Sequence, residues 1–181
     1  MKKILFLLIS ISCFSQTKQP DTDFYIHDNS VYWQHTYDAP NQSIEDLSIQ
    51  FLKLIDGNIK FNNLKKTTSE ITFEVIDDVP NYKKYGGSLL TVNYIASLYM
   101  NYNVSAEFKE GKYRVTIKNI VLDNKQVGFL KTDGKIEDFC TRNKSTEFKT
   151  GSNITQGLIY DHKHFTEKFD IKTLSNQNSN W

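Results

Sequence analysis

Residues 98–122 read LYMNYNVSAEFKEGKYRVTIKNIVL. Apolar and polar side chains alternate on both sides of Glu110-Gly111, which predicts an antiparallel β-hairpin with one buried face and one face in water. A turn at Glu110-Gly111 also fixes the pairing register. The pairs on the apolar face are Phe108 with Tyr113, Ala106 with Val115 and Val104 with Ile117, and those on the polar face are Glu107 with Arg114, Ser105 with Thr116 and Asn103 with Lys118. We expect the rest of the chain to be organised around this hairpin.

Two segments have apolar residues at helical spacing. The first begins at Ser43, an N-cap residue with Asp46 three positions later, and ends at Asp56-Gly57. Its apolar face consists of Ile44, Leu47, Phe51, Leu54 and Ile55. The second segment, close to the C-terminus, contains Ile154, Leu158, Ile159, His162, Phe165 and Phe169. We predict a helix in each segment.

Further strands are predicted on both sides of the hairpin. Alternation marks 31–37, 59–65 and 70–77, and 126–131 is predicted as a short edge strand. The alternating run that starts at Leu90 is too long for one flat strand in a domain about 40 Å across. We therefore expect a bend, bulge or break near 93–97, with a short helix there as the less favoured alternative. The order β-α-β-β-β-β-α predicts an α+β fold with both helices on the apolar face of the sheet.

The N-terminal residues predict export. Lys2-Lys3 and the apolar run 4–9 have the form of a signal peptide spanning 1–15, and the run is too short to span a membrane. Cys13 and Ser15 are suitably small for cleavage before Gln16. We expect a periplasmic or secreted protein.

A lipoprotein is the alternative. Ile11-Ser12-Cys13 resembles the end of a bacterial lipobox, which would make Cys13 a lipidated N-terminus and bring the protein to a membrane. Ser10, however, stands where that motif has Leu, Val or Ile. The remaining chain divides into a polar linker (16–29), one domain (30–174) and a flexible tail (175–181). Within the domain, 133–151 is predicted as a polar loop.

Composition excludes several classes of protein. The chain has 22 Lys+Arg and 21 Asp+Glu of mixed sign, without the basic stripe that nucleic-acid binding requires. After cleavage Cys140 is the remaining cysteine, so no disulfide framework is available, and we expect its thiol to be buried.

The chain resembles a family of exported bacterial domains of unknown function with a TBP-like fold (DUF4468-like). The resemblance rests on Val31-Tyr32-Trp33, on the helix at 43–55 and on the segment EGKYRVTIKNI at 110–120, and it covers roughly 28–124. It implies a curved antiparallel sheet with helices on one side. It implies no reaction, and the TBP-like label does not imply DNA binding. The loop 78–87 and the stretch 133–151 have no counterpart in the family pattern.

Candidate catalytic and metal-binding groups have simpler explanations. His162 and His164 point nearly apart on a helix and cannot share a metal ion there, whereas on a strand they could, with a carboxylate as third ligand. His35 on the inner face is expected to be a hydrogen-bonded core histidine, and Asp77-Asp78 is expected to point in opposite directions at a strand end. The sequence contains no catalytic motif. We therefore predict no enzyme, no catalytic residue, no cofactor and no metal.

A binding surface is the remaining prediction. The loop Tyr82-Lys83-Lys84-Tyr85 presents two aromatic and two cationic side chains, and Glu107, Arg114 and Lys118 lie on the polar sheet face. We expect a binding module for an envelope protein or a small ligand. The alternative is a small-ligand or lipid carrier, with a cavity between the sheet and the C-terminal helix lined by Trp33, Phe73, Tyr94 and Phe165.

Overall fold

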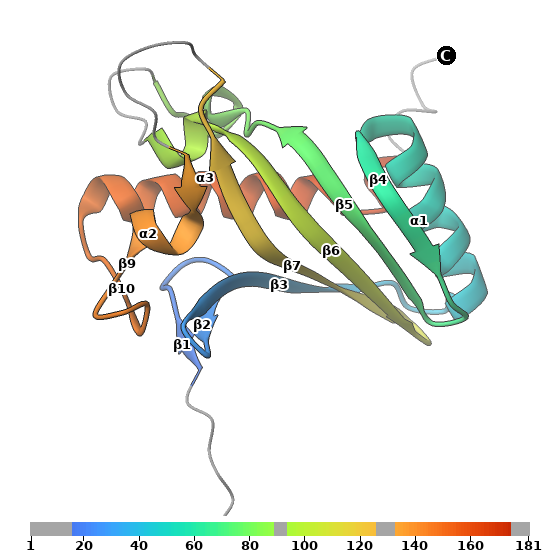
Figure 1. Ribbon diagram of the computed structural model, residues 1–181. Coiled ribbons are helices and arrows are strands. Elements are labelled where there is room, and N and C mark those ends of the chain that lie inside the picture. Colours follow the sequence, from blue (N-terminus) through green and yellow to red (C-terminus); the bar gives the residue numbers. More distant parts are fainter. Residues whose placement is uncertain (1–15, 89–93, 126–132, 175–181) are drawn as a thin grey trace, which may run out of the picture.

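An antiparallel sheet in the order β1-β2-β3-β7-β6-β5-β4, with β8 next to β7, forms the body of the protein (Figure 1). This computed structural model describes residues 16–88, 94–125 and 133–174. The strands are β1 (Thr17–Lys18), β2 (Phe24–His27), β3 (Ser30–Asp38), β4 (Phe61–Lys66), β5 (Glu70–Asp78), β6 (Tyr99–Lys109), β7 (Lys112–Asp123), β8 (Gly134–Lys135), β9 (Thr141–Arg142) and β10 (Glu147–Phe148). The helices are α1 (Ile44–Asn58), α2 (Ile136–Cys140) and α3 (Ser152–Lys168), and the 3₁₀ turns are η1 (Tyr82–Tyr85) and η2 (Tyr94–Ser97).

The predicted hairpin is the centre of this sheet. β6 and β7 pair in the expected register, from Phe108 opposite Tyr113 to Asn103 opposite Lys118. β3 pairs with the outer side of β7, and β5 pairs with the outer side of β6. The residues of β6 and β7 predicted to face the core are buried, including Ile117 with no exposed surface. The predicted pairing of residues 103–108 with 113–118 and the predicted buried face are confirmed.

Two long helices cover the apolar face of the sheet, as predicted. Ser43 caps α1, its hydroxyl accepting a hydrogen bond from the backbone N–H of Asp46 (3.1 Å). The ring of Phe51 in α1 lies 5.9 Å from that of Tyr113 in β7. α3 crosses behind the strands, with the ring of Phe165 5.5 Å from the indole of Trp33 (Figure 1). The fold is α+β with the predicted layers.

β-bulges bend the sheet on both sides of β6. The register shifts in β4, β5 and β7, and each of these shifts contains a residue with positive φ: Asn63 (55°), Asp77 (58°) and Asn119 (54°). Asn and Asp adopt this left-handed conformation more readily than most residues. The backbone N–H of Asp77 donates to Oδ1 of Asn101 in β6 (2.9 Å) and is thereby satisfied. Since bulges increase the bend and twist of strands, these short polar residues curve the sheet.

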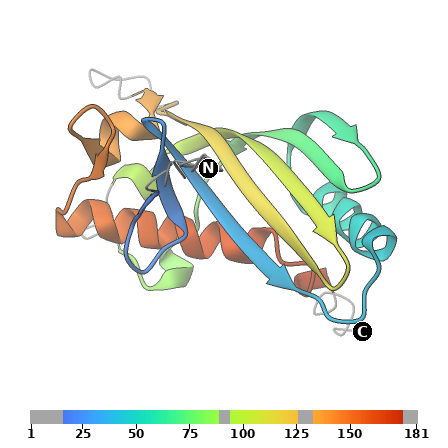
Figure 2. The same ribbon diagram turned by 90° about the horizontal axis from the view of Figure 1, so that it is seen from below.

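The prediction of a linker over 16–29 is wrong. β1 and β2 form a hairpin there, and β2 pairs with β3. Phe24 is fully buried, and its ring lies 6.1 Å from that of Phe165; Figure 2 shows the hairpin beside α3. Phe24 and Ile26 alternate with Tyr25 and His27 over only four residues. So short a pattern in a polar segment gives little local signal, and the non-local partner β3 determines the strand.

The prediction of a loop over 133–151 is also wrong. The segment contains β8, the short helix α2 and the β9–β10 pair. Ile136 and Cys140 lie one helical turn apart and are both fully buried, which fixes α2 against the sheet. The expected burial of Cys140 is confirmed.

The expected interruption near 93–97 is confirmed. It has the form of the less favoured alternative, a short helix: the 3₁₀ turn η2, after which β6 begins at Tyr99. The predicted signal peptide, the lipidation alternative at Cys13, the strand at 126–131 and the tail 175–181 lie outside the described residues. Over the residues that the structure does describe, no helix is both long enough and apolar enough to cross a membrane.

Candidate functional site

The polar face of the sheet contains an open groove of about 840 Å³. Successive strand residues point to opposite faces, so this groove lies on the side away from the core. Its polar lining consists of Gln34, Asn63, Lys65, Thr72, Glu74, Asn103, Ser105, Glu107, Arg114, Thr116, Lys118 and Asn119. A second hollow of about 500 Å³ shares Gln34, Arg114, Lys118 and Asn119 with the first, and it reaches Tyr32 and His27. We call the two hollows together the sheet groove.

The predicted residues Glu107, Arg114 and Lys118 all line the sheet groove. Nη2 of Arg114 donates to Oε2 of Glu107 (2.7 Å), and both side chains are more than two-fifths exposed, so water screens this pair and it contributes little stability. The side chain of Lys118 has no hydrogen bond or ion pair with any other described residue. The structure therefore brings together the three residues predicted for the sheet face.

Thr116 faces the sheet groove, as the register predicts. We expected it to be exposed to water, and it is not. Only 6% of its surface is accessible. Its hydroxyl accepts a hydrogen bond from Nε2 of Gln34 on β3 (3.0 Å), and Ser105 lies opposite on β6. Strands on both sides cover this short side chain in the middle of the sheet, so a polar residue is nearly buried on the polar face.

The loop Tyr82–Tyr85 belongs to another part of the molecule. It forms η1 and contacts α3, which lies on the opposite side of the sheet from the sheet groove. The hydroxyl of Tyr85 donates to Oε2 of Glu167 (2.9 Å), and Lys84 forms an ion pair with the same carboxylate. Tyr82 and Tyr85 are half-buried, and Lys83 and Lys84 are exposed. The predicted binding surface is therefore two separate surfaces.

Asp77 and Asp78 point in opposite directions, as predicted. Asp77 sits in the bulge of β5 and forms ion pairs with Lys60 (2.9 Å) and with Lys125. Its neighbour Asp78 is buried beneath α3 and accepts hydrogen bonds from three groups. These donors are the Tyr102 hydroxyl (2.5 Å), Nε2 of His164 (3.0 Å) and Nζ of Lys168 (2.6 Å).

The electrostatics of Asp78 are dominated by these partners. Burial by itself raises the pKa of the carboxyl, but the hydrogen bond from His164 and the charge of Lys168 together bring the pKa well below its usual range. Burial likewise raises the pKa of the Tyr102 phenol well above its usual value. The group is therefore an ionised, fully partnered carboxylate inside the protein, which is typical of a structural network.

Asp161 on α3 is a buried carboxyl of the opposite kind. It is fully buried, and neither of its oxygens has a hydrogen-bond partner among the described residues. Burial, with the nearby charge of Asp78, raises the pKa of Asp161 well above its usual range. Its carboxyl therefore holds a proton more readily than an exposed aspartate does.

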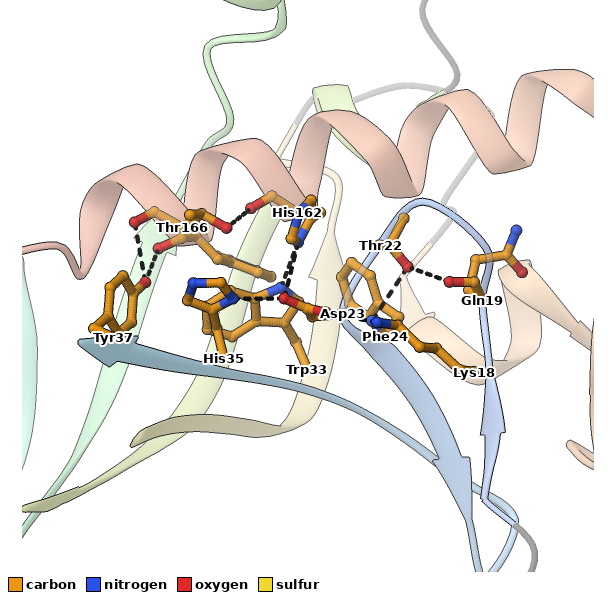
Figure 3. A network of polar contacts seen from close by, with 11 residues as sticks. Lys18, Gln19, Thr22, Asp23, Phe24, Trp33, His35, Tyr37, His162 and Thr166 are labelled. Carbon is orange, nitrogen blue, oxygen red and sulfur yellow. Dashed lines mark hydrogen bonds and ion pairs between the residues drawn. The ribbon is translucent and has the colours of Figure 1, made fainter. Parts of the chain in front are cut away.

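Asp23, in the loop between β1 and β2, links the N-terminal hairpin to β3 and α3 (Figure 3). Its Oδ2 lies 2.6 Å from Nδ1 of His35 and 3.9 Å from Nδ1 of His162, and its Oδ1 accepts from Nζ of Lys18 (3.0 Å). His35 is hydrogen-bonded, as predicted. Its partner Asp23 lies in the segment 16–29, which the sequence predicts to be a linker. The sequence therefore did not reveal the contact between Asp23 and His35.

His162 and His164 point to different partners, as their helical spacing predicts. His162 contacts Asp23 and accepts a hydrogen bond from the Trp33 indole, whereas His164 contacts Asp78. No group of three His, Cys, Asp or Glu side chains in the described ranges is arranged to hold a metal ion.

If the protein were a small-ligand or lipid carrier, we expected a cavity between the sheet and the C-terminal helix. The side chains predicted to line this cavity are packed together in the core. A residue that lines an open cavity keeps surface that a water molecule can touch. Trp33 and Phe165 keep none, and Phe73 keeps 2%. The predicted cavity at these three residues is therefore wrong; the side chain of the fourth, Tyr94, lies outside the described residues.

The curved sheet with helices on one face defines an α+β protein with a DUF4468-like, TBP-like fold. Two solved structures share this arrangement. A TBP-like protein from Parabacteroides distasonis superposes with a TM-score of 0.54 at 13% identity, covering 82% of this chain and 96% of that one. A DUF4468 family protein from Bacteroides ovatus superposes with a TM-score of 0.53 at 12% identity, covering 82% of this chain and 86% of the other.

These likenesses establish the fold. No protein-family model matches the sequence, and no curated protein matches it. The family resemblance predicted from Val31-Tyr32-Trp33, the Ser43 helix and the β7 segment is confirmed at the level of the fold. The function has to be inferred from the surfaces described above.

Proposed function

We propose that the protein is an exported, non-enzymatic binding module of the cell envelope. We further propose that its sheet groove binds an elongated, uncharged, hydroxyl-rich ligand such as an oligosaccharide. The observation that carries the proposal is the continuous polar groove across the central strands. Backbone groups of these strands are paired within the sheet, so the side chains are the groups left for a ligand.

The charges of the sheet groove favour an uncharged ligand. Three cationic side chains are matched by three carboxylates: Lys65, Arg114 and Lys118, and Asp28, Glu74 and Glu107. Between them lie amides and hydroxyls, which both donate and accept hydrogen bonds, as ligand hydroxyls do.

The size and polarity of the groove favour a long ligand over a protein partner. Five inter-strand steps separate β4 from β2, which gives a length of roughly 24 Å at about 4.8 Å a step. Among the described lining residues, Leu64 is the exposed large aliphatic side chain, and it stands on the edge strand β4. Among the described lining residues, the centre of the groove therefore has no exposed aliphatic side chain of the kind that forms the apolar core of a protein interface.

A bulky residue at the centre of the sheet groove should prevent binding. Asn103 is exposed on β6, and Asn103→Trp fills the groove at a strand position that accepts aromatic residues. The matched control is Lys53→Trp on the exposed face of α1. We expect native mass spectrometry of protein purified from its source to detect a bound oligosaccharide on the wild type and on the control, and at least tenfold less on Asn103→Trp.

Other outcomes of the same measurement contradict the proposal. A lipid retained by all three proteins would favour a carrier. A protein partner that Asn103→Trp still binds would place the binding site outside the sheet groove.

Export is a separate part of the proposal, supported by the signal-like segment 1–15. We expect the exported protein to begin at Gln16 without a lipid. Intact-mass measurement of protein recovered from the producing cell tests this. A diacylglycerol adduct on Cys13 would make the protein a membrane-anchored lipoprotein instead.

A further inference from the structure

One ring nitrogen of His162 faces two partners. Nδ1 lies 3.1 Å from Nε1 of Trp33 and 3.9 Å from Oδ2 of Asp23 (Figure 3). An indole N–H can only donate a hydrogen bond, so Nδ1 must be unprotonated to accept it. The observed arrangement therefore contains a neutral His162 with its proton on Nε2, bound to the indole rather than to the carboxylate.

We propose that His162 is a proton-operated switch that exchanges the indole of Trp33 for the carboxylate of Asp23. A proton on Nδ1 turns this nitrogen from acceptor to donor, and the hydrogen bond from Trp33 is lost. Oδ2 of Asp23, 3.9 Å away, is an acceptor for this proton. The switch thus joins α3, which carries His162, to the loop of the N-terminal hairpin, which carries Asp23.

The surroundings of His162 set the direction of the switch. Trp33 is fully buried, so protonation leaves an indole N–H in the core without an acceptor. Burial lowers the pKa of His162 below its usual value, and Asp23 opposes this shift. The remaining facing groups also disfavour the imidazolium: His35 on β3, Lys18 on β1 and Lys163 on α3.

The carboxylate stays available throughout. Burial raises the pKa of Asp23, but the hydrogen bonds from His35 and Lys18 bring the pKa below its usual value overall. Asp23 is therefore ionised over the whole range from pH 7.5 to 4.5. Because the folded pKa of His162 lies below its unfolded value, its contribution to stability is complete above pH about 6.5 and is lost as the pH falls toward the folded pKa.

The indole resonance of Trp33 tests the switch directly. The chain has two tryptophans, so Trp181→Phe leaves Trp33 as the single indole. In ¹H–¹⁵N spectra of this protein between pH 7.5 and 4.5, we expect the Trp33 Nε1–H resonance to move upfield in one transition with its midpoint below pH 6.5. In His162→Gln, whose amide oxygen still accepts from the indole but does not titrate, the resonance should stay in place.

Neighbouring variants separate His162 from the other titrating groups. His35→Gln should keep the transition, which excludes His35 as its source. Asp23→Asn, which removes the carboxylate that favours the imidazolium, should move the midpoint to lower pH. The proposal is overturned if the indole resonance titrates unchanged in His162→Gln, or if it does not move in the wild type.

A second measurement needs no substitution at His162. Long-range ¹H–¹⁵N spectra distinguish the two ring nitrogens of each histidine. Above the transition, Nδ1 of His162 should have the shift of an unprotonated nitrogen. A protonated Nδ1 at pH 7.5 would exclude the switch even if every variant at this position failed to fold.

Discussion

Replacement of Ile117 by aspartate should leave little folded protein. Ile117 is fully buried in β7, opposite Val104 of β6 and Trp33 of β3. A carboxylate there would be enclosed by apolar side chains without a partner, at a cost of several kcal/mol against a total stability of about 5–15 kcal/mol. Urea denaturation followed by circular dichroism should show an unfolded or barely folded protein at neutral pH.

Asn103→Asp is the matched control for this substitution. Asn103 neighbours the buried Val104 on β6, but its side chain is exposed on the polar face, opposite Lys118. Aspartate has nearly the same shape and gains a cation across the strands, so we expect a change below about 1 kcal/mol. If Asn103→Asp unfolds the protein and Ile117→Asp is tolerated, the inner and outer faces of the sheet are exchanged.

Asp78→Asn should be the second strongly destabilising substitution. The amide keeps the shape of the side chain but removes the charge that Lys168 and His164 contact. Lys168 is only 15% exposed, so its ammonium would be left nearly buried without a counter-charge. Loss of one partner from a buried ion pair costs about 3–5 kcal/mol, which we expect as the drop in the free energy of unfolding.

Asp77→Asn is the control, made at the adjacent residue. The side chain of Asp77 is 28% exposed, so water screens its ion pairs with Lys60 and Lys125, and asparagine also tolerates the positive φ of 58°. Because screened ion pairs contribute little, we expect the free energy of unfolding of this variant to fall by less than about 1 kcal/mol. Equal losses in the two variants would show that the bend of β5, rather than the buried ion cluster, is what both substitutions damage.

The effect of Asp78→Asn should also depend on pH. The folded pKa of Asp78 lies well below the unfolded value of about 3.9, so the stabilisation by its charge is complete above that value and lost as the pH falls below it. The difference in unfolding free energy between wild type and Asp78→Asn should therefore be constant from pH 7 to 5 and shrink below pH 4. A difference that begins to shrink between pH 7 and 5 would show that a group other than the Asp78 carboxyl controls it.

Local pattern was enough to predict the centre of the fold. The β6–β7 register follows from the turn at Glu110-Gly111 and the alternation around it, because both strands of the pair lie in one stretch of sequence. The Ser43 helix carries its cap and its apolar face within its own residues. The conformation of these elements depends on residues that are close together in the sequence. Sequence patterns can therefore predict them.

The elements that the sequence did not reveal are decided by distant partners. β2 has only four residues, and its burial depends on β3 and on Phe165 in α3. The short helix α2 is held by the burial of Ile136 and Cys140 and by a hydrogen bond from the backbone N–H of Val31 to Glu137 (2.7 Å). Neither element has a periodic pattern long enough to stand out locally.

The candidate site was predicted in part for the same reason. Glu107, Arg114 and Lys118 share one face through strand alternation alone, so the sheet groove could be anticipated. The position of Tyr82–Tyr85 depends on Glu167, far along the chain, and the Asp23 group depends on both β3 and α3. Tertiary contacts of this kind leave no mark in the local pattern.

The position of β3 beside β7 also affects the order in which the protein assembles during synthesis. Gln34 and Thr116 are hydrogen-bonded across these strands but are 82 residues apart in the chain. At about 5–20 residues per second, roughly 4–16 s pass between the synthesis of Gln34 and that of its partner. Throughout this interval β3 can pair with β2, but its partner strand β7 has not yet been made. The apolar side of β3 is therefore accessible to chaperones for seconds before β7 exists. Once β6 and β7 are made, their hairpin forms in about 1–10 μs and can pair with β3.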